Sequence, residues 1–206
     1  MPEQSQKAGD SYDYSTRGGV RAISWNDFHG LVKALVRAVA PWKPRIILPI
    51  GRGGYYPGTL MAHMLQTELY PVRLSRRERD VVVRATPQWL VPPPAGVAGH
   101  RVLVVDEISS TGETLSLARA RLLAMDVAEV RTAALYAHTW GVDAADYVAL
   151  ITDELVLNPW DRELYLDGEF KLHPEYTQAL NEQGLKPQSE MLIDAPIYIA
   201  EKFAPP

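Results

Sequence analysis

The sequence predicts an α/β fold in which a mostly parallel β-sheet is flanked by helices. Two runs carry this prediction, residues 45–50 (RIILPI) and 101–105 (RVLVV), because each is short, apolar and followed by a glycine-containing loop and a helical pattern. Such runs are typical of strands that are buried on both faces of a parallel sheet. Their alternation with helices indicates one α/β domain.

Length and composition limit the classes of protein to which the chain can belong. With 206 residues, of which 47% are hydrophobic, the chain can form one domain with a substantial core. The net charge of −4 argues against nucleic acid as the main partner, and the absence of cysteine excludes disulfides and thiolate metal sites. The polar first residues do not resemble a signal peptide, and no apolar run approaches the roughly 18 residues of a membrane span. We therefore expect a cytoplasmic protein with no membrane partner.

The first predicted helix follows Ser24, which we expect to be its N-cap, with Asp27 giving an imperfect capping box. Apolar residues recur at helical spacing from Trp25 to Val39, and Pro41 and Pro44 end the helix. The other predicted elements are a helix from about Pro57, strands at 68–74, 130–137 and 147–151, and a weak helix at 175–182.

The chain is predicted to have three parts. Residues 1–20 form a mobile N-terminal arm, residues 21–165 form the α/β domain, and residues 166–206 form a C-terminal extension packed on the same domain. Within the domain, residues 75–99 are highly charged at first and then rich in proline. Long irregular excursions of this kind commonly serve as lids or binding loops.

The stretch Arg101 to Thr114 combines a buried strand with a cluster of polar groups. Asp106 and Glu107 come at the carboxyl end of the strand, where open α/β sheets bind their ligands. Hydroxyl side chains and a glycine then precede a helix, and such a helix start presents backbone N–H groups and a positive dipole end to an anion. The stretch therefore predicts a site for a phosphorylated and hydroxylated ligand.

Two common phosphate-binding motifs do not fit this stretch. A GxxxxGK[ST] loop requires a lysine, and none lies between Asp106 and Thr114. A dinucleotide fingerprint requires GxGxxG, which neither Gly112 nor the run Gly51–Gly54 supplies.

Three segments instead resemble type I phosphoribosyltransferases. Residues 104–114 (VVDEISSTGET) resemble the family's phosphoribosyl-diphosphate (PRPP) signature of apolar residues, two acids and a hydroxyl- and glycine-rich loop. Residues 47–65 (ILPIGRGGYYPGTLMAHML) resemble the pyrophosphate-contacting loop and helix of the xanthine–guanine and hypoxanthine–guanine branch. Residues 157–161 (LNPWD) resemble the purine-covering segment of that branch. The resemblance covers about residues 24–165 and implies a flanked parallel sheet with a small hood and a flexible lid loop.

The resemblance also implies an activity. A Mg²⁺-dependent enzyme of this family transfers the 5-phosphoribosyl group from PRPP to a ring nitrogen of a base and releases pyrophosphate, as in nucleotide salvage. A purine is implied as the base, and a 6-oxopurine is favoured by the Gly–Arg loop and the Pro-Trp-Asp segment. The substrates are thus small molecules, and the family further implies a homo-oligomer.

Matching the motifs residue by residue gives each candidate a role. Asp106 and Glu107 are expected to bind the ribose hydroxyls and Mg²⁺, because carboxylates supply hydrogen-bond acceptors and hard oxygen ligands. Arg52 is the third catalytic candidate, since a leaving pyrophosphate needs cations and backbone donors. The residues assigned to the 5-phosphate are Ser109, Ser110, Thr111, Gly112, Glu113 and Thr114. Those assigned to pyrophosphate are Gly51, Arg52, Gly53, Gly54 and Arg76, and those assigned to the base are His138, Trp160 and Asp161. Arg76 is one of several lid arginines, of which we expect at least one to contact pyrophosphate.

Two positions depart from the 6-oxopurine pattern. Ser110 stands where the family usually carries an aspartate near the base, and a serine cannot act as a carboxylate base at neutral pH. His138 stands where a lysine commonly contacts the 6-oxygen, and a histidine can donate to an oxo group or accept from an amino group. Two alternatives therefore stay open: transfer to another nitrogen base, and a non-catalytic regulator that binds PRPP or nucleotides.

Overall fold

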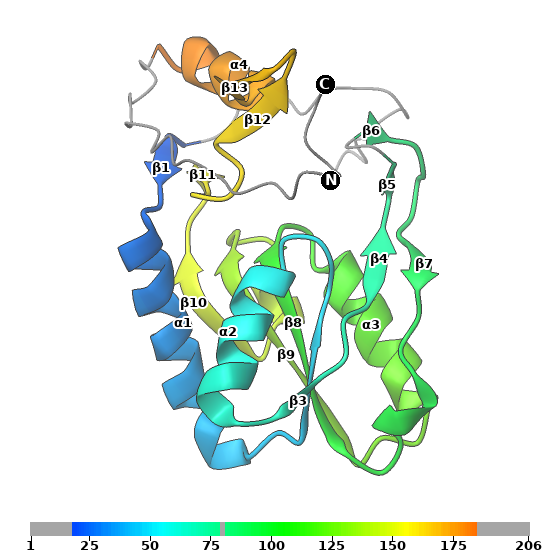
Figure 1. The fold of residues 1–206 in the computed structure, drawn as a ribbon. Helices are drawn as coiled ribbons and strands as arrows, with labels where there is room; N and C mark the ends of the chain where they lie inside the picture. The colour runs from blue at the N-terminus through cyan, green and yellow to red at the C-terminus, as the bar shows by residue number, and fades with distance from the viewer. Residues whose placement is uncertain (1–17, 79–80, 185–206) are drawn as a thin grey trace, which may run out of the picture.

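The computed structural model describes residues 18–78 and 81–184, and its centre is a parallel sheet. Five strands lie in the order β10-β9-β8-β2-β3, and every neighbouring pair is parallel (Figure 1). The strands are β10 (Tyr147–Ile151), β9 (Glu129–Ala137), β8 (Arg101–Ser109), β2 (Ile46–Pro49) and β3 (Glu68–Leu69). The predicted α/β class with a parallel sheet is confirmed.

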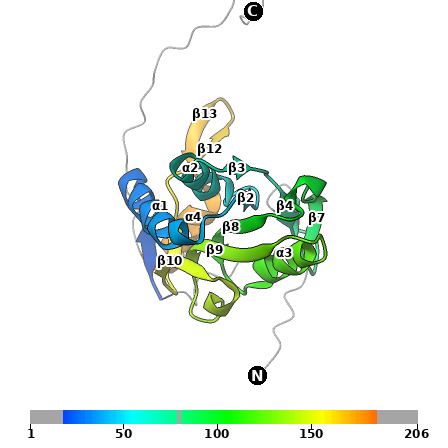
Figure 2. The ribbon, with the colours of Figure 1, turned by 90° about the horizontal axis from the view of Figure 1, so that it is seen from below.

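Helices cover both faces of this sheet. Helices α1 (Trp25–Val39) and α2 (Tyr55–Leu65) lie on one face, and α3 (Glu113–Leu123) lies on the other (Figure 2). Strand β8 separates two cores because its side chains alternate between the faces. Leu103 and Val105 belong to the cluster formed with α1 and α2, and Val102 and Val104 belong to the cluster formed with α3.

Helix α1 begins and ends where the sequence predicts. The Ser24 Oγ accepts from the Asp27 N–H at 3.1 Å, and the Asp27 carboxylate accepts from the Ser24 N–H at 3.0 Å. Both halves of a capping box are therefore present, with aspartate in place of the usual glutamate. Beyond Val39 the chain turns through a short 3₁₀ helix, Ala40–Trp42, that contains the first of the two prolines.

The excursion after β3 is more regular than predicted. Of the predicted strand at 68–74, Glu68–Leu69 form β3 and Val72 makes an isolated parallel bridge with Ile50, after which the chain leaves the sheet. Two antiparallel pairs then follow, formed by β4 (Arg73–Ser75) with β7 (Gln88–Val91) and by β5 (Arg77–Glu78) with β6 (Val81–Val82). A 3₁₀ turn, Ala95–Val97, leads back to β8. The β4–β7 pair lies beside α3, and the β5–β6 pair rises beyond the carboxyl end of the sheet (Figure 1).

The C-terminal part forms a second structure above the same end of the sheet. Strand β11 (Leu155–Leu157) pairs with β1 (Val20–Ala22), and β12 (Glu163–Leu166) forms a hairpin with β13 (Glu169–Leu172). Helix α4 (Pro174–Glu182) follows and confirms the weak helix predicted there. We call residues 163–182 the C-terminal unit; it lies over the sheet's carboxyl end in Figure 1.

The two ends of the chain extend beyond the residues that the structure describes. Most of the predicted N-terminal arm and the last part of the predicted C-terminal extension lie outside the described residues. Among the helices of residues 18–78 and 81–184, none is both long and apolar enough to cross a membrane.

Candidate active site

Two strand–loop–helix units meet at the carboxyl edge of the sheet. In the first, β2 is followed by Gly51–Gly54 and α2; in the second, β8 is followed by residues 110–112 and α3. Strands β2 and β8 are direct neighbours, with Pro49 opposite Val105. The two loops therefore emerge side by side at this edge, although they are far apart in the sequence.

The loop Gly51–Gly54 is fixed by close contacts that leave no room for side chains. A Cβ on Gly53 would collide with the Glu107 carboxylate, and a Cβ on Gly54 would lie 2.6 Å from the carbonyl oxygens of both Ile50 and Val105. The peptide bond between Gly51 and Arg52 is cis. The glycines therefore let the backbone approach the end of β8 closely, and they carry Arg52 to the edge of the site.

Glu107 faces the side of the sheet that α1 and α2 cover. Its carboxylate accepts a hydrogen bond from the Asn158 Nδ2, and the same amide lies 3.4 Å from Asp161. Burial, followed by the negative charges of Asp161 and Asp106, raises the pKa of Glu107 to about 8. A carboxyl group with this pKa is mostly protonated at neutral pH until a cation or a hydrogen-bond donor stabilises its charge.

Asp106 precedes Glu107 near the carboxyl end of β8. Its Oδ1 accepts from the Glu107 N–H at 2.8 Å. Burial raises the pKa of Asp106 to about 7, although this hydrogen bond partly opposes the shift. The two acids are adjacent in sequence, and of the two only Glu107 lines the cavity described below.

The donor set at this strand end fits a Mg²⁺ ion that is bound together with a phosphorylated substrate. No group of three or more metal-ligating side chains occurs in the described part of the chain. Magnesium is usually held by one or two carboxylates plus substrate phosphates, and the Asp106–Glu107 pair supplies the two carboxylates. Burial raises the pKa of both acids because a buried negative charge is unfavourable. A bound cation would compensate that charge.

The loop that follows β8 has the features of an anion site. The buried Ser109 hydroxyl donates to the Gly141 carbonyl at 2.7 Å, which ties the start of the loop to the segment after β9. Gly112 adopts a left-handed φ of 79° immediately before α3. Within the described residues, no protein acceptor pairs with the Thr111 or Gly112 N–H. These N–H groups and those of the first helical turn are available to an anion.

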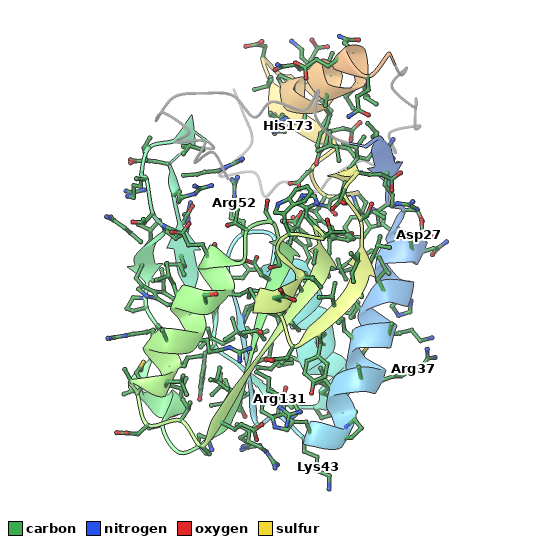
Figure 3. The ribbon with its side chains drawn as sticks, turned by 180° about the vertical axis from the view of Figure 1, so that it is seen from behind. Asp27, Arg37, Lys43, Arg52, Arg131 and His173 are labelled. Atoms are coloured by element: carbon green, nitrogen blue, oxygen red, sulfur yellow. The ribbon has the colours of Figure 1, made fainter. Side chains whose placement is uncertain are left out.

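A cavity of about 430 Å³ lies beside the first loop. Its walls come from the Gly–Arg loop, the lid pairs, the end of β8 and the C-terminal unit. The lining residues are Gly51, Arg52, Gly53, Tyr56, Arg73, Ser75, Arg77, Glu107, Trp160, Asp161, Glu163, Leu164, His173 and Tyr176. In Figure 3, Arg52 extends from the end of the sheet and His173 lies above it on the C-terminal unit. Segments that are distant in sequence thus enclose one space.

Several predicted residues come together at this cavity. Arg52, Glu107, Trp160 and Asp161 all line it, together with Gly51 and Gly53. Gly54 lies directly behind, against the backbone of β2 and β8. The predicted 5-phosphate residues 109–114 are at the same edge of the sheet but do not line this cavity.

Two predicted residues are placed elsewhere. Of the lid arginines, Arg77 lines the cavity whereas Arg76 does not. His138 is 3% exposed, and its Nδ1 lies 2.7 Å from the Thr152 carbonyl oxygen while its ring stacks on Trp140. The structure therefore does not bring His138 to the cavity, because its ring is turned towards the end of β10.

Trp160 belongs to a cluster of aromatic rings. Tyr56 stacks on it with a centroid distance of 4.3 Å and an interplanar angle of 12°. Phe28 meets it edge to face at 5.0 Å, and Trp25 lies 6.1 Å away. Trp160 is thus anchored on α1 and presents its stacking surface towards α2.

Sequence reasoning missed the contributions of Tyr56 and of the C-terminal unit. Tyr56 is the second residue after the Gly–Arg loop, in the first turn of α2, and this position could have indicated that it lies near the site. His173 and Tyr176 carry no local signal, because they reach the cavity only after the β12–β13 hairpin folds the chain back over the sheet.

Comparisons with known proteins agree with this geometry. The sequence matches the phosphoribosyl transferase domain family over residues 24–165. It is 26% identical to the xanthine-guanine phosphoribosyltransferase of Idiomarina loihiensis over 146 residues, which covers 69% of this chain and 88% of that protein.

Solved structures share the fold. A purine phosphoribosyltransferase from Pyrococcus horikoshii is 23% identical with a TM-score of 0.63, and the match covers 73% of this chain and 99% of that one. The xanthine-guanine-hypoxanthine phosphoribosyltransferase of Helicobacter pylori is 20% identical with a TM-score of 0.59, covering 68% of this chain and 93% of that one. With a family match over more than half of its length, and with the motifs of that match gathered at one sheet edge, this chain belongs to the phosphoribosyl transferase domain family.

Proposed function

We propose that this protein transfers the 5-phosphoribosyl group from PRPP to a ring nitrogen of a purine base and releases pyrophosphate. The observation that carries the proposal is the shared cavity, where the Gly–Arg loop, Glu107 and Trp160 lie around one space. Such a space offers a cation, a carboxylate and a flat aromatic surface to one ligand. A phosphoribosyl donor beside a heteroaromatic acceptor requires that combination.

The donor would lie between the two strand–loop–helix units. Arg52 and the backbone of Gly51–Gly54 are suited to the pyrophosphate, because close backbone approach and a guanidinium stabilise the charge on a leaving group. Residues 109–114 are suited to the 5-phosphate through the unpaired N–H groups at the start of α3. Asp106 and Glu107, between the two loops, are suited to the ribose hydroxyls.

Asp106 and Glu107 would also hold Mg²⁺, which supplies charge neutralisation to the pyrophosphate when it is bound. The surrounding chain contributes positioning. Asn158 holds the Glu107 carboxylate, and the Glu107 N–H holds that of Asp106. Arg73 and Arg77 bring further positive charge from the lid to the same cavity.

The acceptor would stack near Trp160, since stacking suits any flat base. A purine is favoured because the relatives named above are purine phosphoribosyltransferases. Among purines we favour a 6-oxopurine, because the relative from I. loihiensis is a xanthine-guanine enzyme and the Gly–Arg and Pro-Trp-Asp segments resemble that branch.

During transfer the bond from ribose C1 to the pyrophosphate oxygen breaks, the bond from C1 to the ring nitrogen forms, and the nitrogen loses its proton. Ser110 cannot take that proton as a carboxylate would. Of the described residues that line the cavity, those with a carboxylate or imidazole able to accept it are Glu107, Asp161, Glu163 and His173. Closure of the lid pairs would exclude water from the cation-like ribose.

A base panel tests the proposal. The protein is mixed with PRPP, Mg²⁺ and hypoxanthine, guanine, xanthine, adenine or a pyrimidine, and pyrophosphate release is measured. We expect release with the 6-oxopurines. Release with adenine alone would refute the 6-oxopurine preference, and release with no base would refute the transferase. Light scattering during size-exclusion chromatography checks the homo-oligomer that the family implies.

A second candidate is a regulator that binds nucleotides without turnover. Ser110 in place of the family's usual aspartate favours it, and so does a structure of similar fold. A hypothetical protein from Neisseria gonorrhoeae with bound ppGpp is 24% identical with a TM-score of 0.60, covering 81% of this chain and 97% of that one. Tight nucleotide binding without pyrophosphate release for any base would support this candidate.

A further inference from the structure

The stacking surface of Trp160 is already covered by a side chain of the protein itself. Tyr56 lies nearly parallel to the indole, with 4.3 Å between the ring centroids and 12° between the planes. Offset parallel stacking at this separation is also how a flat base would bind to an indole. The phenol ring therefore has the geometry of a bound aromatic ligand.

Trp160 cannot move away from Tyr56 to admit a ligand, because aromatic rings of α1 pack against it. Phe28, which meets it at 5.0 Å with an interplanar angle of 77°, is buried in the core between α1 and the sheet. Trp25 lies on the same helix at 6.1 Å. A base cannot enter between Trp160 and Tyr56 while both keep their places, because their rings are already in contact.

Tyr56 is the partner that can move. It lies in the first turn of α2 and is 41% exposed, whereas Phe28 is 6% exposed. It lines the cavity beside Arg52, Glu107 and Asp161, the groups that surround the proposed reaction centre. Rotation of an exposed side chain would leave the helix in place and disturb no buried packing.

We propose that Tyr56 occupies the place of the acceptor base on Trp160 and that a purine must displace it, so that Tyr56 determines acceptor specificity. This inference rests on the proposed function. A bicyclic purine covers more of the indole than a phenol ring does, whereas a monocyclic pyrimidine covers about the same area. Displacement is therefore favourable for purines and close to neutral for pyrimidines.

Replacing Tyr56 tests the inference, because the inference predicts that the KM for the base falls rather than rises. For Tyr56→Ala we expect the KM for the purine that turns over fastest to fall about threefold to tenfold, with the KM for PRPP changed less than about twofold. Activity with pyrimidines should rise relative to the wild type. Tyr56→Leu, which keeps apolar bulk but cannot stack, should behave in the same way if the alanine variant folds poorly.

Matched variants separate stacking from other effects. Tyr56→Phe keeps the ring and should keep the wild-type KM for the base. Trp160→Ala should raise that KM, opposite in sign to Tyr56→Ala. Tyr165→Ala removes an aromatic ring that is 66% exposed and does not line the cavity, and it should change neither constant.

Two results would overturn the inference. A raised purine KM in Tyr56→Ala would mean that the base stacks on Tyr56 rather than replacing it. An unchanged KM in both Tyr56→Ala and Tyr56→Leu would mean that Tyr56 does not meet the base. Both results require an active wild-type enzyme, so they differ from a failure of the proposed function, in which the wild type releases no pyrophosphate with any base.

Discussion

The loops of the two strand–loop–helix units at the sheet edge are held in different ways. After β2, three of four residues are glycines, and Gly54 lies so close to β2 and β8 that the loop is set by packing. After β8, hydroxyl residues lead to Gly112, and within residues 18–78 and 81–184 the backbone N–H groups just before α3 have no protein acceptor. The first unit is a closely packed wall of the cavity, and the second is an open anion site.

This difference suggests how one sheet edge can distinguish two phosphate groups. A packed wall with Arg52 suits a group that must leave, because charge can be stabilised at a fixed point as it develops. An open set of N–H groups suits a group that stays bound throughout. Asp106 and Glu107 lie between the two loops, near the carboxyl end of β8.

The largest expected effect comes from the acids between the two units. Asp106→Asn combined with Glu107→Gln should lower turnover at least about a hundredfold, because it removes the charges assigned to the ribose and to Mg²⁺. Initial rates of pyrophosphate release measure the loss. A urea titration serves as the control, since the variant should remain folded. Undiminished turnover would show that the ribose assignment is wrong.

The stability of the protein should be sensitive to one methyl group added in the loop Gly51–Gly54. Gly54→Ala should destabilise the protein by about 1–3 kcal/mol, because its Cβ would lie 2.6 Å from two carbonyl oxygens. Urea unfolding measures the change. Gly30→Ala in α1 is the matched control: a Cβ there meets nothing within 4 Å, and the substitution should stabilise the helix by roughly 0.5–1 kcal/mol. Equal effects at both glycines would contradict the packed-wall description.

Stability should also depend on pH through the acid pair. Because burial raises the pKa values of Asp106 and Glu107 to about 7 and about 8, the folded protein keeps protons that the unfolded chain has released above about pH 4. The ligand-free protein should therefore lose stability as pH rises from about 4 to about 8. Urea midpoints measured at several pH values without Mg²⁺ check this slope.

The Asp106→Asn, Glu107→Gln variant should flatten that pH slope. Asp146 offers the matched control with the opposite sign. Burial alone would raise its pKa, but hydrogen bonds from Arg119 and from the Thr132 N–H lower it overall. Asp146→Asn should reduce stability at all pH values above about 4 and leave the slope between pH 4 and 8 unchanged. A slope that survives in the double variant would assign it to other groups.

A smaller effect should distinguish two neighbouring lid arginines. Arg77 lines the cavity and Arg76 does not, so Arg77→Ala should raise the KM for PRPP about tenfold through loss of one charged contact. Arg76→Ala is the control and should change this KM less than about twofold. The reverse order would restore Arg76, the residue favoured by the sequence, as the pyrophosphate contact.

The sequence by itself determined the sheet, its helices and the positions of the two loops at the sheet edge. Local patterns were sufficient for these features: apolar runs for β2 and β8, the Ser24 cap for α1, and the order of acids, hydroxyls and glycine before α3. Each pattern is read within about a dozen consecutive residues, where backbone geometry and side-chain alternation act directly.

Only the tertiary structure decided which residues share the cavity. Of the two acids only Glu107 lines the cavity, of the two neighbouring arginines only Arg77 lines it, and His138 turns towards Thr152. The β12–β13 hairpin brings His173 over the sheet, and α2 places Tyr56 on Trp160. These contacts join segments that are up to about a hundred residues apart, and their energies depend on packing that no local pattern encodes.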